Sequence, residues 1–91
     1  MLKISWLPTA TDDLAEIITF IAERSPQAAH NLRQRIENAI LPVAEHPYLY
    51  KSGRVLGTRE IVAHPNYIII YRVTDTDIEI VNVLHARQEY P

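Results

Sequence analysis

The amino-acid sequence predicts an α+β fold with the element order β-α-α-β-β-β, in which an N-terminal helical hairpin packs on a small, mainly antiparallel twisted sheet. Two observations carry this prediction. Two apolar stripes with helical spacing follow one another in the first half of the chain, and three apolar segments separated by short turns occupy the second half. A chain of 91 residues can build one hydrophobic core, so we expect a single domain over residues 1–91.

The first elements are a short strand and a helix. Residues 2–7 alternate between apolar and polar side chains, as a strand does, and Pro8 ends this strand because it has no backbone N–H to donate. Residues 9–11 then offer a helix N-cap, and the two aspartates that follow suit the positive end of the helix dipole. We expect the helix to run to about Arg24. Its apolar stripe is formed by Leu14, Ile17, Ile18 and Ile21.

A second helix follows at once. Ser25 is a typical N-cap residue, and Pro26 stands at the first helical position, where its missing N–H costs nothing. The stripe of this helix consists of Ala29, Leu32, Ile36, Ala39, Ile40 and Val43. Pro42 should kink or thin its last part. The two helices are therefore expected to form a hairpin with a very short turn.

The second half of the chain predicts a three-stranded meander. Residues 48–54 have the composition of a loop, and strands are expected over residues 57–63, 67–74 and 77–85, joined by tight polar turns. The middle segment is apolar at both odd and even positions, as is typical of a central strand. One face of such a sheet would carry the helices, and we expect the partly open face to carry the function.

The charge balance excludes some classes of function. The net charge is −2 and the isoelectric point is about 6.0. A protein that holds nucleic acid nonspecifically needs an excess of lysine and arginine, which is absent here. A nucleic-acid-binding regulator is also disfavoured, because neither expected helix carries a cluster of basic residues.

No cofactor or metal is expected from the residue types. The chain has no cysteine, which removes disulfides, thiolate metal sites and a cysteine nucleophile, and which suits a reducing cytoplasm. The four histidines show no paired spacing with a carboxylate, so we expect no metal site. No apolar run approaches the ~18 residues that span a bilayer, and no signal peptide is evident. We therefore expect a cytoplasmic protein without a membrane partner.

Motifs along the whole chain indicate a family. They are an Arg59-Glu60 pair in a strand, then Tyr67-x-x-x-Tyr71-Arg72, then a last strand that runs into His85-x-Arg87. This arrangement resembles the C-terminal half of the RelE/ParE toxin superfamily of type II toxin–antitoxin systems. The two expected helices and residues 6–10 are similar to its N-terminal half, so the resemblance covers essentially the whole chain.

Within that superfamily, residues 45–50 and 83–88 resemble the ParE-like subgroup, whose members are known for poisoning DNA gyrase rather than for cutting RNA. The resemblance implies a growth-inhibiting toxin of a system that stabilises plasmids. It also implies neutralisation by a cognate antitoxin in a tight complex, which can be a higher-order hetero-oligomer. On this interpretation the protein is not an enzyme.

Two alternatives remain open. A ribosome-dependent mRNA interferase, a RelE-like endoribonuclease, would use His85 or Tyr90 as acid or base, with Arg87 and Arg59 as phosphate clamps. The isoelectric point argues against it, because docking on ribosomal RNA requires a basic surface. A non-toxic protein-interaction module of the same fold is the second alternative.

Six residues are candidates for contact with a target or antitoxin, and each also has a structural interpretation. They are Arg59, His64, Arg72, Tyr48, Tyr50 and Arg54. The structural interpretation of Arg59 is that it simply forms an ion pair with Glu60 on the solvated face of the sheet. Arg72 interrupts an apolar strand and must reach solvent, a partner or an ion pair. The two tyrosines could stack on a partner or cover the edge of the core, whereas His64 and His85 could be ordinary surface histidines.

Overall fold

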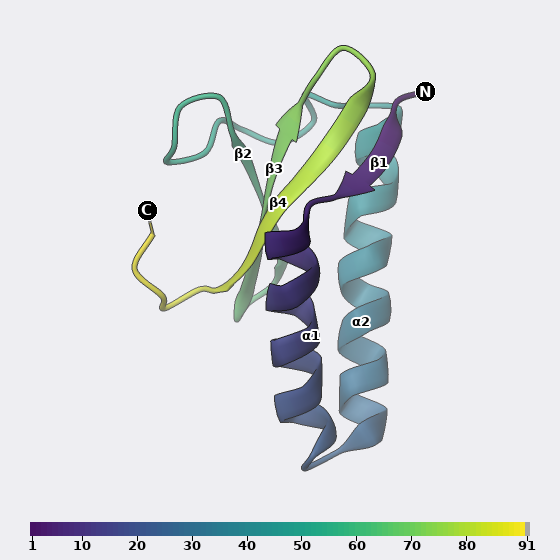
Figure 1. Ribbon diagram of the computed structural model, residues 1–91, viewed down its shortest axis with the longest axis vertical. Helices are drawn as coiled ribbons and strands as arrows, with labels where there is room; N and C mark the ends of the chain where they lie inside the picture. Colours follow the sequence, from purple (N-terminus) through teal and green to yellow (C-terminus); the bar gives the residue numbers. More distant parts are fainter. Residues whose placement is uncertain (91) are drawn as a thin grey trace.

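Two helices cover one face of a four-stranded mixed sheet (Figure 1). The structure is a computed structural model that describes residues 1–90. Its elements are β1 (Lys3–Trp6), α1 (Pro8–Ala22), α2 (Pro26–Ile40), the 3-10 turn η1 (Leu41–Ala44), β2 (Arg59–His64), β3 (Tyr67–Val73) and β4 (Asp77–His85). This order and this layering confirm the predicted α+β fold, and β4 has the predicted bounds.

The start of α1 differs from the prediction. The helix begins at Pro8, preceded by Leu7 in an extended conformation, and no side chain caps it. The N-cap expected at residues 9–11 is wrong, because the φ angle of proline is already helical and starts the helix earlier. Thr9 instead donates its hydroxyl to the Val81 carbonyl of β4, at 2.7 Å.

The second helix agrees with the prediction. Ser25 caps α2 by accepting the backbone N–H of Ala28 at 3.1 Å, and Pro26 is the first helical residue. The α-helix ends at Ile40, and Pro42 lies in η1, where the chain tightens into a 3-10 turn. The proline thus thins the end of the helix as expected.

The sheet has the order β1-β4-β3-β2. Strands β2, β3 and β4 form the expected antiparallel meander, although β2 starts at Arg59 rather than at residue 57. The sequence did not predict where β1 pairs: it lies parallel to β4, with Lys3 opposite Asp77 and Trp6 opposite Ile80. Because this pairing ends at Ile80, no strand within residues 1–90 lies beside the rest of β4 on that side.

The core lies between the helices and the sheet. Leu14 and Ile36 from the helices meet Ile69, Tyr71 and Ile80 from the sheet in one apolar cluster. Neighbouring residues of β3 are fully buried, which confirms that both faces of this strand are covered over its middle part. Within residues 1–90, no helix is long and apolar enough to cross a membrane.

Candidate functional site

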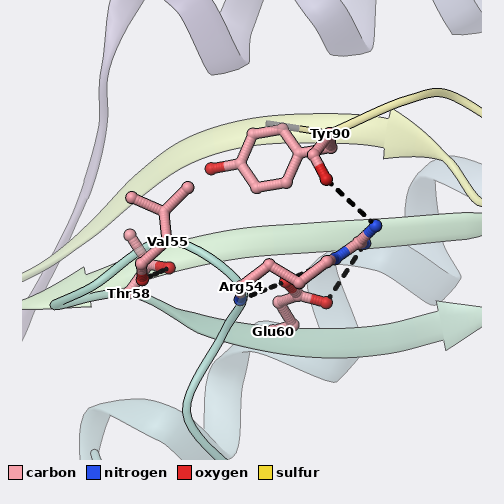
Figure 2. A network of polar contacts seen from close by, with 5 residues as sticks. All are labelled: Arg54, Val55, Thr58, Glu60 and Tyr90. Carbon is pink, nitrogen blue, oxygen red and sulfur yellow. Dashed lines mark hydrogen bonds and ion pairs between the residues drawn. The ribbon is translucent and has the colours of Figure 1, made fainter.

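The first group of predicted site residues is built around Arg54, in the loop before β2. Its guanidinium and its backbone N–H both donate to the carboxylate of Glu60, with N–O distances of 2.9 to 3.3 Å. Nη1 of Arg54 also donates to the carbonyl oxygen of Tyr90 at 3.4 Å, and Figure 2 shows the guanidinium reaching both partners. Arg54 therefore ties the C-terminal segment and the loop to β2.

The loop that carries Arg54 is shaped for this contact. Thr58 donates its hydroxyl and its N–H to the Val55 carbonyl, at 2.7 and 3.1 Å, which closes a tight turn (Figure 2). Gly57 in that turn has a φ of +84°, which favours glycine. A Cβ atom at Gly53 would lie 2.6 Å from Thr58 Oγ1, so the close approach of the loop to β2 also requires glycine.

The electrostatics of the pair follow from its geometry. Hydrogen bonds from the Arg54 side chain lower the pKa of Glu60, against the opposing effect of burial, and the charge of Lys51 adds to the lowering. The same hydrogen bond raises the pKa of Arg54. Arg59 is not the partner of Glu60, because adjacent strand residues point to opposite faces. The interpretation of these two as an ion pair is therefore wrong.

Arg59 belongs to a second group with the two tyrosines of the preceding loop. Its Nη1 donates to the Tyr50 carbonyl at 2.6 Å, and its Cζ lies 4.8 Å from the centre of the Tyr48 ring. Tyr50 packs on the core, as its structural interpretation predicted, whereas 66% of Tyr48 is exposed. Tyr48 alone of the two is open to a partner.

Arg72 forms a structural ion pair. It lies directly opposite Glu79 in the β3–β4 register, its Nε donates to Glu79 Oε1 at 2.9 Å, and its Nη2 lies 2.8 Å from the same oxygen. This pairing explains how an otherwise apolar strand tolerates a charge at this position.

The third group joins two histidines through a tyrosine. Tyr67 faces His64 on β2 and His85 on β4, with ring centres 5.7 and 5.4 Å apart. Nδ1 of each histidine accepts the backbone N–H of the residue two positions later, at 3.0 Å from Asn66 and 3.1 Å from Arg87. In the neutral state each ring therefore carries its proton on Nε2.

Sequence reasoning missed Tyr67 as a site residue. The position of Tyr67 in the sequence could have indicated its role. It is the first residue after the β2–β3 turn, and the strand register places it beside residues of both neighbouring strands. The sequence indicated His64 for contact with a target or antitoxin and His85 for catalysis. The structure brings both to one end of the sheet.

The residues proposed for RNA cleavage are divided among these groups. His85 contacts Tyr67, Tyr90 contacts Arg54, and Arg59 contacts Tyr48. Arg87 is exposed and contributes its backbone N–H to His85. Residues 1–90 hold no cluster of three or more histidine and carboxylate side chains that could bind a metal.

The helical hairpin on one face of the sheet, together with the matches to known proteins, places the chain among the RelE/ParE-like toxins. Residues 4–90 match the family described as the ParE toxin of type II toxin-antitoxin system, parDE, and the chain belongs to this family. The match confirms the resemblance seen in the sequence motifs.

Individual relatives agree with the family assignment. Y4kP of Sinorhizobium fredii, provisionally named as a toxin, is 40% identical over 90 residues, covering 98% of this chain and 93% of its own. Toxin RelE2 of Caulobacter vibrioides is 35% identical over 88 residues, covering 94% and 97%. A structure of the chromosomal ParDE TA system from P. aeruginosa shares the fold, with a TM-score of 0.80 at 20% identity, over 93% of this chain and 96% of that one.

Proposed function

We propose that this toxin acts by binding and inhibiting DNA gyrase rather than by cutting RNA. The observation that carries the proposal is that the residues a cleavage site would need lie in separate groups. Arg59 is held by the loop before β2 and Tyr90 contacts Arg54, whereas His85 lies beside Tyr67. RNA cleavage requires cationic side chains that face the phosphate and stabilise the negative charge that develops on it. These cations must lie next to an acid and a base.

The exposed side chains near the same groups suit a protein target. Large apolar residues are exposed on the loop before β2 and on β2 itself: Tyr48, Leu49, Leu56 and Val62. Exposed aromatic and aliphatic side chains are typical anchors of protein–protein interfaces. We propose that this surface, together with Arg59 beside Tyr48, contacts the gyrase.

A second candidate function rests on the two histidines. His64 and His85 flank Tyr67 and each presents an Nε2–H, which is an arrangement capable of general acid–base chemistry. The relative named RelE2 supports keeping a RelE-like endoribonuclease as this alternative. In that case His85 would act as acid or base, and Arg87, Arg59 and Tyr90 would have to be recruited on the ribosome.

The proposal also includes a cognate antitoxin. Membership of a type II toxin family and the likeness to a ParDE toxin–antitoxin system support a tight complex that silences the toxin. We propose that the protein encoded beside this toxin is that antitoxin.

Two assays on one refolded, antitoxin-free sample test the target. We expect inhibition of gyrase supercoiling and intact mRNA on translating ribosomes. Leu56→Asp should weaken gyrase inhibition, whereas Leu41→Asp, at a position also exposed but on η1, should leave it unchanged. His85→Gln should leave inhibition within about twofold of the wild type, since no catalytic step depends on it.

The opposite result would support the second candidate function. If the wild type cleaves mRNA, His85→Gln does not, and supercoiling is unaffected, the endoribonuclease replaces the gyrase proposal.

A further inference from the structure

A groove runs between α1 and residues 81–85 of β4. Within residues 1–90, this part of β4 is not paired with β1. Thr9 and Asp13 of α1 reach the β4 backbone at Val81 and Val83. Beyond these contacts a hollow of about 360 Å³ opens between the second half of α1 and the β4 end, and Phe20 and His85 are among its lining residues. A second, shallower hollow of about 630 Å³ adjoins it on the outer side of Phe20.

Phe20 is the exposed aromatic residue of this groove. It lines both hollows, and 57% of it is exposed, although a phenylalanine on a helix usually turns to the core. The guanidinium carbon of Arg24 lies 4.8 Å from the ring centre. Arg24 therefore makes a cation–π contact with this ring from four positions further along the chain, whereas Glu16 lies four positions before Phe20.

The rim of the groove is acidic. Helix α1 contains Asp12, Asp13 and Glu16 and no lysine or arginine, and Glu16 lines both hollows with Phe20. Among residues 1–90, the side-chain ion pairs are Arg54–Glu60 and Arg72–Glu79, so Glu16 has no cationic partner of its own. An exposed aromatic ring beside a carboxylate without a cationic partner is complementary to a segment that carries both apolar and cationic side chains.

We infer that this groove binds an arginine- or lysine-bearing apolar segment of the antitoxin, with one cation seated between Phe20 and Glu16. The inference rests on the proposed neutralisation by an antitoxin. Because His85 and Tyr67 line the same hollow, a segment seated there also covers the histidine–tyrosine group. The antitoxin would thereby shield one end of the sheet from any other partner.

A binding titration of refolded toxin with the purified product of the adjacent gene tests the inference. Glu16→Lys should raise the Kd by about tenfold or more, and Phe20→Ala should raise it by a similar factor. Raising the salt concentration should weaken wild-type binding more than it weakens binding of Glu16→Lys, since the variant has lost the ionic contact.

Two matched controls lie elsewhere. Asp75→Lys changes the charge by the same amount in the exposed β3–β4 turn, and Leu41→Ala removes an exposed apolar side chain from η1. Both should keep the wild-type Kd. All variants should keep the far-ultraviolet circular dichroism spectrum of the wild type, because the substituted side chains are exposed.

The titration distinguishes a wrong docking site from a wrong partner. If the wild type binds the antitoxin and the Glu16 and Phe20 variants bind equally well, the groove is not the docking site, while the proposed neutralisation stands. If the wild type itself does not bind, the proposed neutralisation by that protein fails. A photo-crosslinking residue at position 20 should join an arginine- or lysine-containing antitoxin segment, and crosslinks only to acidic segments would overturn the inference.

Discussion

Arg54 donates three hydrogen bonds to Glu60, from its backbone N–H, its Nε and its Nη2, at 2.9, 3.1 and 3.3 Å. The same guanidinium holds the carbonyl of Tyr90. One carboxylate on β2 therefore organises a loop and the C-terminal segment, two parts of the chain that have no regular secondary structure of their own.

The pH dependence of stability should reveal this carboxylate. The pKa of Glu60 is lowered in the folded protein from its usual 4.5, chiefly by the Arg54 hydrogen bonds. Its stabilising contribution is thus present above about pH 4.5 and is lost as the pH falls through the lowered pKa. Urea unfolding should show Glu60→Gln less stable than the wild type near neutral pH, with the difference closing as the pH falls below 4.5 and through the lowered pKa of Glu60.

A constant difference between the two proteins across that pH range would show that the carboxylate charge of Glu60 contributes nothing. Glu89→Gln is the matched control, since the exposed Glu89 side chain forms no ion pair or hydrogen bond with any other of residues 1–90. It should follow the wild type at every pH.

Asp13 should be important for stability because it covers an open strand edge. Its Oδ2 accepts the side-chain amide of Asn82 at 2.9 Å and the backbone N–H of Val83 at 3.0 Å. Asp13→Ala should lower the free energy of unfolding by about 1–3 kcal/mol, since both donors lose their partner. Denaturant unfolding measures this loss.

The neighbouring aspartate provides the control for that substitution. Asp12 is exposed on the same turn of α1, so Asp12→Ala should change stability by no more than about 0.5 kcal/mol. Equal losses in the two variants would indicate an effect on the helix itself rather than on the β4 edge.

Tyr71 joins the core to the loop before β2. Its ring is fully buried, and its hydroxyl donates to the Pro47 carbonyl at 2.9 Å. Tyr71→Phe should cost about 1 kcal/mol of unfolding free energy at neutral pH. Tyr48→Phe removes an exposed hydroxyl and should be neutral by comparison.

The same residue predicts an alkaline transition. Burial raises the pKa of Tyr71 above its usual 10.0, so its contribution is present below about pH 10 and is lost as the pH rises through the raised pKa. Wild-type protein should therefore lose more stability than Tyr71→Phe in alkaline denaturant titrations. Parallel curves for the two proteins would contradict this.

Arg59 should order the loop before β2. A lysine cannot reproduce the planar contact with Tyr48 together with the donation to Tyr50. Arg59→Lys should therefore speed amide hydrogen exchange over residues 48–56, while α1 and α2 keep wild-type protection. Arg33→Lys, on the exposed side of α2, should leave the exchange of this loop unchanged.

Local sequence signals predicted most elements of this fold. Ser25 followed by Pro26 marked the start of α2, and the apolar positions of residues 67–73 marked a strand covered on both faces. These signals are reliable because capping and side-chain periodicity depend on residues a few positions apart. Together with the Tyr67-to-Arg72 motif and the His85-x-Arg87 ending, they were sufficient to recognise the family.

The partners of the charged and aromatic residues were decided by the tertiary structure alone. Glu60 pairs with Arg54 rather than with its neighbour Arg59, and His64 meets His85 only through Tyr67. The parallel pairing of β1 with β4 was equally invisible. Such choices depend on which strands lie side by side and in which register, and these are set by the burial of the whole core rather than by any short stretch of sequence.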